Sequence, residues 1–217
     1  MGAVDGHPPA LRDLPMFPLS TVLFPTGRLP LHVFEARYRR MVGDCLAGDG
    51  RFGVVLIARG SEVGGGDERY AVATEAAVAD PRPLPDGRWL LEAAGVRPVR
   101  VRRWLGDDPY PRAEVEPLEA AGRAPPEPLV AGAERAVRRA RALLSELGAA
   151  PALDPGPVAG AGAGADGVVW ALCGAAPVAV LDRQRLLEAP GHAERLELLR
   201  TLADAVAEDA LHLLAGR

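Results

Sequence analysis

The side chains that could act as nucleophiles, bases or metal ligands are few and widely separated. Serine occurs at only three positions: Ser20, Ser61 and Ser145. None lies in the G-x-S-x-G pattern that exposes a serine on a sharp strand-to-helix turn. A hydrolase is therefore a disfavoured interpretation of this sequence. His32 and Glu35 could share a metal ion, but no second pair with ligand spacing accompanies them. Asp107 and Asp108, in GDDPYP, are typical of a turn. We therefore expect no catalytic residue, no metal and no cofactor.

Composition limits the class of protein further. With 217 residues, 48% of them apolar and 25% charged, the chain suits one large or two small globular domains. A formal net charge of −4 argues against a general binder of nucleic acid or acidic membranes. The opening MGAVDGHPPALRD lacks the pattern of a signal peptide, and no apolar run approaches the roughly 18 residues of a membrane span. Cys45 and Cys173 are typical of buried thiols in a reducing compartment, so we expect a cytoplasmic protein with no membrane partner.

One strand-like segment is basic and suggests an alternative function. Four arginines lie close together, at Arg97, Arg100, Arg102 and Arg103. Trp104 follows them and could stack on a base, so this pattern favours RNA binding as the alternative. Alternating arginine also fits a solvated strand face, and both the acidic total charge and the neighbouring aspartates argue against the RNA interpretation. Steep salt dependence would identify RNA binding, because phosphate contacts release counterions.

Short apolar runs separated by turn residues predict the elements of the first half. Strands are expected at Ser20–Phe24, Leu29–Phe34, Phe52–Ala58, Tyr70–Ala79, Arg88–Glu92, Val99–Trp104 and Ala113–Leu118. Pro85–Gly87 is the clearest hairpin signal, and many short strands of this kind indicate a small, closed or nearly closed barrel. One helix interrupts them, because apolar residues recur at spacings of three and four and Gly48 can end it. Its apolar face comprises Phe34, Tyr38, Met41, Val42 and Cys45.

The second half has helical periodicity. Apolar residues at helical spacing predict a helix over Val130–Leu147, a short one over Val168–Ala176 and a last one over His192–Leu214. Asp182 is a candidate N-cap for a helix over 183–188, and the Gly- and Ala-rich residues 155–167 are expected to form a flexible link. The apolar face of the last helix could pair with a second subunit, but packing on Val130–Leu147 explains it equally well.

The order of motifs near the start resembles the amino-terminal, substrate-binding domain of the Lon proteases. The segments that carry the resemblance are LPMFPL (14–19), FPTG (24–27), LPLH (29–32), FEARY (34–38), Asp49 and FGVV (52–55). Residues 84–119 look like the second half of that domain, and residues 182–199 like its helical tail. Ala73 and Thr74 depart from the family's usual Gly-Thr pair.

The resemblance implies an α+β fold, in which a PUA-like small β-barrel with one inserted helix is followed by a C-terminal α-helical bundle. We accordingly expect a loose segment at 1–13, a barrel subdomain at 14–122 and a helical subdomain at 123–217. A full Lon protease also needs a phosphate-loop lysine and a Ser-Lys dyad. The 217 residues contain no lysine, so we expect a free-standing, non-enzymatic member of the family.

The resemblance and the apolar opening together predict a protein that binds polypeptide. In the family this domain helps to recognise unfolded or tagged polypeptides, and the opening has more large apolar residues than one barrel wall needs to bury. The candidate substrate-binding residues are Phe17, Phe24, Leu29, Leu31, Phe34, Glu35, Arg37 and Tyr38. We expect an unfolded or extended polypeptide as the partner, captured by strand addition or in a groove, with a separate protease or chaperone as a second partner.

Overall fold

The computed structural model describes residues 11–62, 66–118, 124–148 and 164–216. These residues belong to two compact units. The first unit comprises Met1–Leu23 and Arg28–Glu119, and the second comprises Phe24–Gly27 and Ala120–Arg217. The short segment Phe24–Gly27, which connects two strands of the first unit, is therefore counted with the helices of the second.

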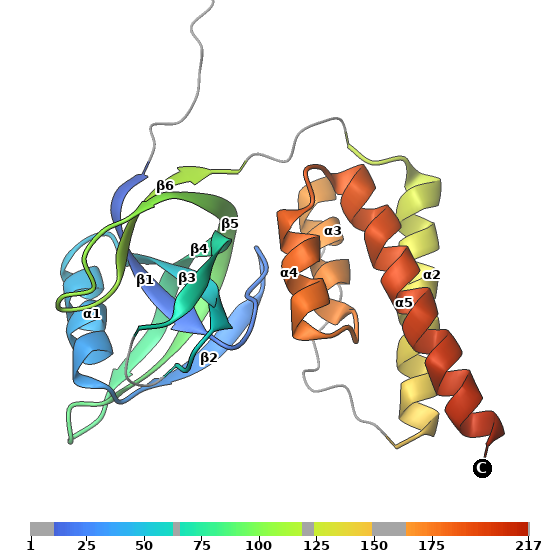
Figure 1. Ribbon diagram of the computed structural model, residues 1–217, viewed down its shortest axis with the longest axis horizontal. Helices are drawn as coiled ribbons and strands as arrows, with labels where there is room; N and C mark the ends of the chain where they lie inside the picture. Colours follow the sequence, from blue (N-terminus) through green and yellow to red (C-terminus); the bar gives the residue numbers. More distant parts are fainter. Residues whose placement is uncertain (1–10, 63–65, 119–123, 149–163, 217) are drawn as a thin grey trace, which may run out of the picture. The chain divides into compact units, whose positions relative to one another are not determined.

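The first unit is built on a mixed sheet (Figure 1). Its strands are β1 (Leu11–Leu19), β2 (Arg28–Val33), β3 (Arg51–Arg59), β4 (Glu68–Pro83), β5 (Trp89–Trp104) and β6 (Arg112–Pro117). β1 is parallel to β3, and the other pairings are antiparallel. The order is β2-β5-β4-β3-β1-β6, and β6 also pairs with β5, so the pairings from β1 through β3, β4, β5 and β6 return to β1.

Strand length decides the role of β2. β5 has 16 residues, long enough for its first part to pair with β2 and its last part with β6. β2 pairs with β5 in continuous register, from Arg28↔Ala94 to Val33↔Trp89. Among the residues that the structure describes, β2 has no second strand partner. It therefore lies at the edge of the sheet.

One helix forms among the described residues of the first unit, α1 (Ala36–Ala47), and it packs beside the sheet. Tyr38, Met41, Val42 and Cys45 are buried on one face of α1, which confirms the predicted spacing. The Gly48 backbone N–H donates to the carbonyls of Asp44 and Cys45, so the helix ends where the sequence predicted. These side chains join the larger of two apolar cores in the first unit, and the smaller core lies around Met16, Val55 and Val99.

Three predictions for the first unit are wrong. No strand forms over Ser20–Phe24: β1 ends at Leu19, the Leu23 carbonyl accepts a hydrogen bond from Thr74 Oγ1 at 2.6 Å, and Phe24 begins a turn closed by Gly27. Val22, Leu23 and Phe24 are nevertheless buried, without strand pairing. The expected loose segment at 1–13 is too long, because β1 already begins at Leu11; residues 1–10 lie outside the described residues.

The third wrong prediction divided one strand into two. The segments predicted at Arg88–Glu92 and Val99–Trp104 belong to the continuous strand β5, whose pairing with β4 shifts register between Glu75 and Ala76 instead of ending. The hairpin predicted at Pro85–Gly87 is confirmed. The Leu84 N–H donates to the Arg88 carbonyl at 2.8 Å, and Gly87 takes a φ of 82°, which glycine adopts without strain.

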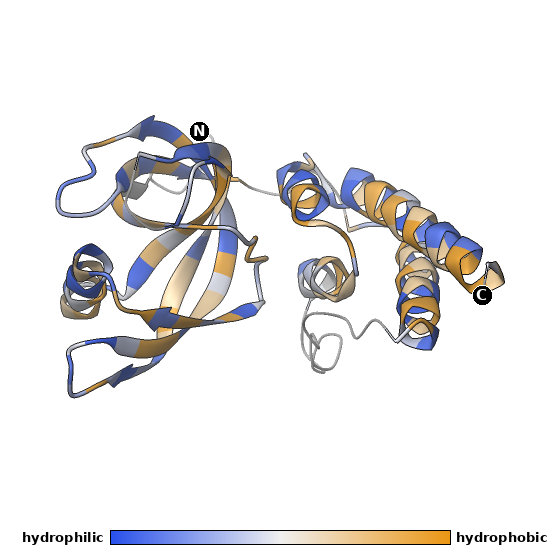
Figure 2. Cartoon of the chain, turned by 60° about the horizontal axis from the view of Figure 1, so that its bottom comes forward, coloured by the Kyte–Doolittle hydropathy of each residue, from blue (hydrophilic) through white to orange (hydrophobic). Residues whose placement is uncertain are grey.

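The second unit is helical and contains α2 (Glu127–Glu146), α3 (Ala165–Ala175), α4 (Val180–Glu188) and α5 (His192–Ala215). α2 and α5 contact each other along their lengths, as the intramolecular interpretation of the last helix predicted (Figures 1 and 2). Both helices carry fully buried alanines, whose small side chains allow close approach. They are Ala133, Ala140, Ala203, Ala207 and Ala210.

Two further predictions for the helical half need correction. Asp182 lies in the first turn of α4 and does not cap it, because the helix already begins at Val180 with Ala179 as N-cap. The expected link at 155–167 is too long, since residues 165–167 already belong to α3, and its remaining residues lie outside the described residues. The predicted order of a β-rich half followed by a helical half is confirmed.

Candidate functional site

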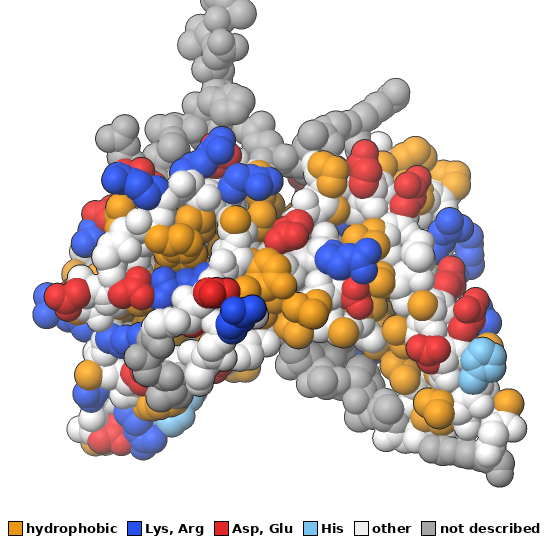
Figure 3. All heavy atoms as spheres, viewed as in Figure 1, with side chains coloured by type: hydrophobic (Ala, Val, Ile, Leu, Met, Phe, Trp, Pro, Cys, Tyr) orange, Lys and Arg blue, Asp and Glu red, His pale blue; other side chains and the backbone are white. Residues whose placement is uncertain are grey.

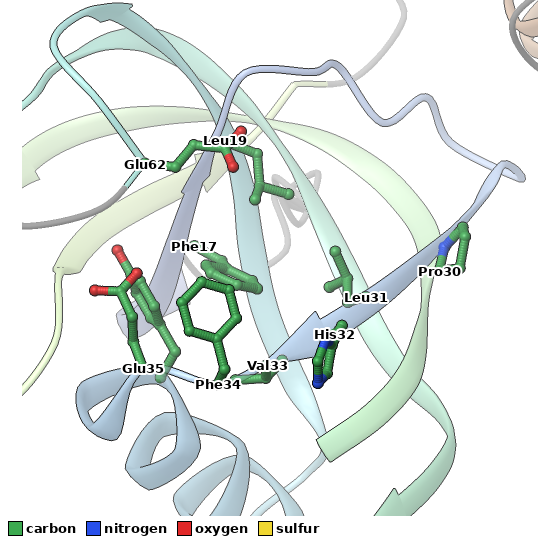
Figure 4. Close-up of a pocket in the computed structure, with 10 residues that line it drawn as sticks. Phe17, Leu19, Pro30, Leu31, His32, Val33, Phe34, Glu35 and Glu62 are labelled. Carbon is green, nitrogen blue, oxygen red and sulfur yellow. The ribbon is translucent and has the colours of Figure 1, made fainter. Parts of the chain in front are cut away.

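A pocket opens on the first unit between the end of β1 and the outer side of β2 (Figure 4). Its volume is about 200 Å³. Most of its lining is apolar or aromatic, and two carboxylates complete it. The lining residues are Phe17, Leu19, Pro30, Leu31, His32, Val33, Phe34, Glu35, Tyr38 and Glu62.

Strand alternation explains how the apolar lining is presented. Phe17 and Leu19 are two positions apart on β1 and therefore project from the same side of the strand. On β2, Leu31 and Val33 face inward, whereas Pro30 and His32 are exposed. The pocket thus lies where one strand ends and an edge strand passes it.

Phe34 is the most exposed aromatic residue of this pocket. It follows the last residue of β2 and precedes Glu35, the N-cap of α1, so neither the sheet nor the helix buries it. Its exposed fraction is 53%, and its ring centroid lies 6.0 Å from that of His32. The prediction that Phe34 belongs to the buried face of the helix is wrong. Figure 4 shows its ring beside Phe17, with Glu35 to one side and Leu31 to the other.

Tyr38 also lines the pocket and is only 2% exposed. Its ring centroid lies 4.4 Å from that of Phe17, and the Arg37 guanidinium carbon lies 4.5 Å from the Tyr38 centroid. Among the described residues, no hydrogen-bond partner contacts its buried hydroxyl. Burial raises the pKa of Tyr38 to about 12, and the nearby Arg37 charge opposes this shift only in part. The hydroxyl is therefore protonated at neutral pH, and its O–H can donate a hydrogen bond.

The carboxylates at the pocket are held by few cations. Glu35 Oε2 accepts from Arg37 Nε at 3.2 Å, and Arg37 Nη2 donates to the Glu62 backbone carbonyl at 3.2 Å. The Glu62 carboxylate accepts a hydrogen bond from the backbone N–H of Ser20. This arrangement offers an apolar cleft with an acidic rim, suited to binding rather than to proton transfer.

The pocket brings together most of the predicted binding residues. Phe17, Leu31, Phe34, Glu35 and Tyr38 line it, and Arg37 contacts three of the lining residues, Glu35, Tyr38 and Glu62.

The two other candidates lie elsewhere. Leu29 is half-buried against the larger core of the first unit. Phe24 belongs to the second unit, where it is 2% exposed. Its ring centroid lies 6.0 Å from that of Trp170 and 4.8 Å from the guanidinium carbon of Arg183. It is therefore not available to a polypeptide in this structure.

Sequence reasoning missed several lining residues. Pro30 and His32 alternate with Leu31 on the same edge strand, so extending the predicted site along the strand could have found them. Glu62 follows β3, far along the chain from the other lining residues, and no local pattern connects it with them.

A second group of polar side chains lies in the helical unit. Arg195 donates to the carbonyls of Leu186 and Ala189 and to His192 Nδ1, at 2.8, 2.6 and 2.9 Å. His192 Nε2 lies 2.8 Å from Asp166 Oδ1. Burial raises the pKa of the neighbouring Cys173 thiol to about 12 and keeps it protonated. An activated thiolate is therefore absent there, and the group fastens α5 to the end of α4.

The arginines of β5 are largely neutralised. Arg97, Arg102 and Arg103 pair with Glu75, Glu116 and Glu114 at 2.5, 2.6 and 2.9 Å. Trp104 lies beneath Arg69, whose guanidinium carbon is 4.8 Å from the ring centroid. On the face shown in Figure 3, basic and acidic side chains alternate over this unit. Among the described side chains on this face, the basic groups are interspersed with acidic ones, unlike the continuous basic surface that binds phosphates.

No group of three or more potential His, Cys, Asp or Glu ligands is found among the described residues. None of the helices in these residues is both long enough and apolar enough to cross a bilayer.

Comparison with known proteins identifies the class to which this fold and pocket belong. Residues 13–204 match the ATP-dependent protease La (LON) substrate-binding domain, so the chain belongs to this family and the predicted resemblance is confirmed. The match covers the substrate-binding domain and no ATPase or peptidase domain.

Curated relatives are longer proteins. The chain is 31% identical over 134 residues to a LON peptidase N-terminal domain and RING finger protein of Schizosaccharomyces pombe, an alignment of 53% of this chain and 27% of that protein. It is 31% identical over 107 residues to the Lon protease of Dictyoglomus thermophilum, over 49% of this chain and 14% of that protein. The chain therefore spans only a minor part of these relatives.

Solved structures show the same fold. The crystal structure of a Lon N-terminal domain protein from Xanthomonas campestris matches with a TM-score of 0.63 and 28% identity, over 87% of this chain and 97% of that one. The N-terminal domain of the Mycobacterium avium complex Lon protease matches with a TM-score of 0.57 and 16% identity, over 88% and 98% of the two chains. The mixed sheet followed by helices is thus the Lon N-terminal domain fold.

Proposed function

We propose that this chain binds unfolded or extended polypeptide through the pocket beside β2. The main support for the proposal is the apolar pocket, in which Phe34 is 53% exposed and lies next to the edge strand β2. Exposed apolar surface of this kind marks an interaction site. Membership of a substrate-binding domain family supports a role in substrate recognition. The ring of strand pairings supports a PUA-like barrel as the scaffold that holds the pocket.

The pocket volume favours a side chain over a small-molecule substrate. Sites for drug-sized ligands have volumes of roughly 300–1,000 Å³. The pocket, at about 200 Å³, is smaller and suits one or two apolar side chains. An extended segment beside β2 would place alternate side chains toward Phe17 and Leu31, while its backbone could pair with the edge of β2. Pro30 has no N–H to contribute, so side-chain contacts would provide most of the affinity.

Capture of this kind needs no ATP and breaks no bond. We propose a non-catalytic, cytoplasmic role as an adaptor or chaperone-like factor, in which the captured segment is passed to a separate protease or chaperone. The free, buried thiols of Cys45 and Cys173 support a reducing compartment.

Substitution of Phe34 tests the proposal directly. A labelled, permanently unfolded polypeptide is titrated with the protein, and binding is followed by fluorescence anisotropy. Phe34→Ala should weaken binding about 5- to 30-fold, because burial of a large apolar side chain contributes about 1–2 kcal/mol at such an interface. Leu46→Ala is the matched control, since Leu46 is also exposed, at 39%, and does not line the pocket. Equal affinities of wild type and Phe34→Ala would contradict the proposal.

The same titration distinguishes the RNA alternative. Affinity that depends on apolar contacts should change little between low and high salt. Affinity that depends on phosphate contacts would fall by orders of magnitude as salt rises over that range. A short RNA and a folded protein serve as competitors, and neither should displace the unfolded polypeptide.

A further inference from the structure

The two carboxylates at the pocket specify the class of polypeptide further. We propose that the pocket selects extended segments in which a lysine or arginine lies two positions from an apolar anchor residue. This inference rests on the proposed function. Its basis is the lining itself, which contains Glu35 and Glu62 but no arginine.

Local ion pairs leave a negative charge in excess at the rim. Arg37 pairs with Glu35, and it donates another hydrogen bond to the backbone carbonyl of Glu62 rather than to its carboxylate. The Glu62 carboxylate is held by the neutral N–H of Ser20, so its charge is oriented and not cancelled. The two carboxylates that line the pocket are therefore matched by one guanidinium, that of Arg37, which contacts two lining residues through hydrogen bonds but does not itself line the pocket.

A neighbouring ion cluster has the same sign. Arg69 pairs with Asp67 at 2.5 Å and with Asp107 at 2.6 Å, again one cation for two carboxylates. Asp67 and Arg69 act on the pKa of Tyr38 in opposite directions, and the effect of Asp67 is the larger, so the charge of this cluster at the pocket is negative on balance. The excess negative charge favours a cationic ligand and disfavours an acidic one.

Strand geometry determines where the cation must lie. In an extended segment, side chains two positions apart project from the same side and lie about 7 Å apart. If the anchor enters between Phe17 and Phe34, a long basic side chain two positions away can reach Glu35, which lies beside these rings in Figure 4, or Glu62, which lies beside Leu19. A basic residue next to the anchor would point away from the pocket.

Three peptides that differ only in charge test the inference. Each carries one phenylalanine anchor, flanked two positions away on both sides by lysine, glutamine or glutamate, and binding is measured by anisotropy at low salt. The lysine peptide should bind about two- to fivefold tighter than the glutamine peptide, as expected for exposed ion pairs, and the glutamate peptide should bind more weakly.

Two matched double variants test whether the Glu35 and Glu62 carboxylates cause the preference for the lysine peptide. Glu35→Gln with Glu62→Gln keeps both hydrogen-bond acceptors and should bring the three affinities together. Glu114→Gln with Glu116→Gln, which removes two carboxylates of β6 that do not line the pocket, should preserve the preference. Two results would contradict charge selection by the pocket and leave the proposed function intact. In the first, the three peptides bind with equal affinity. In the second, the lysine peptide still binds most tightly to the protein with Glu35→Gln and Glu62→Gln. If no peptide binds, both are wrong.

Discussion

Phe34 and Tyr38 illustrate how far residue spacing can predict an environment. They lie four positions apart, which on a helix places two side chains on one face. Tyr38 is buried as expected, but Phe34 precedes the helix and is exposed. The same spacing rule therefore gave one correct and one wrong environment, and the difference arises because the helix begins only at Ala36.

Alkaline pH should reveal the buried tyrosine. Tyr38 has a pKa of about 12 in the fold, whereas a solvated tyrosine ionises near pH 10. Between these values the unfolded chain releases a proton that the folded chain retains, so this group's stabilisation is present below pH 10 and is lost as pH rises toward 12. We expect Tyr38→Phe to flatten the fall in the free energy of unfolding by about 1.4 kcal/mol per pH unit in this interval.

Chemical denaturation at several pH values measures this slope. Tyr110 has a similarly raised pKa, so Tyr110→Phe should also flatten the fall, while Leu46→Ala should leave the slope unchanged. A Tyr38→Phe protein with the wild-type slope would show that the phenol is not protected in the fold.

Elements with strong local patterns were predictable, and those defined by distant contacts were not. The period of α1 and the hairpin at Pro85–Gly87 depend on neighbours in sequence and are confirmed. The run Ser20–Phe24 has strand-like composition, but Thr74 and Trp170 determine its conformation from remote positions. Glu62 joins the pocket for the same kind of reason, through a fold that brings β3's end to β1.

The connection of α4 to α5 depends on one buried arginine. Arg195 satisfies two carbonyls at the end of α4, and its guanidinium carbon lies 4.0 Å from the Trp170 ring centroid. Arg195→Leu should destabilise the second unit by about 1–3 kcal/mol, because the carbonyls lose their donor while the cost of burying a charge is also removed.

Denaturant unfolding monitored by tryptophan fluorescence tests this effect, since Trp170 lies in the affected unit. Arg200→Leu makes the same change at an exposed position of α5 and should alter stability by no more than about 0.5 kcal/mol. Equal stability of the two variants would contradict a fastening role for Arg195.

At the scale of the whole molecule, the family could be inferred before the fold was known. Motifs at the start and in two later segments kept the order of the Lon substrate-binding domain, and the match over residues 13–204 confirms that inference. Periodicity alone could not have supplied the ring of strand pairings, because β5 divides its partners between β2 and β6. Nor could it show that Phe24–Gly27 is counted with the helical unit.

Charge distribution across the chain accords with apolar capture rather than phosphate binding. The chain has no lysine and a net charge of −4. Many of its arginines pair with carboxylates, including those of β5 that suggested RNA binding. The excess negative charge at the pocket therefore adds to a molecule that already disfavours polyanions.

The most direct test of polypeptide binding is hydrogen–deuterium exchange, with and without a saturating unfolded polypeptide. We expect protection to rise in peptides covering the end of β1, from Phe17 to Leu19, and in those covering β2 to the start of α1, from Arg28 to Tyr38. Protection confined to peptides covering the arginines of β5 or to the helical unit, with no change around β2, would contradict polypeptide binding at the pocket.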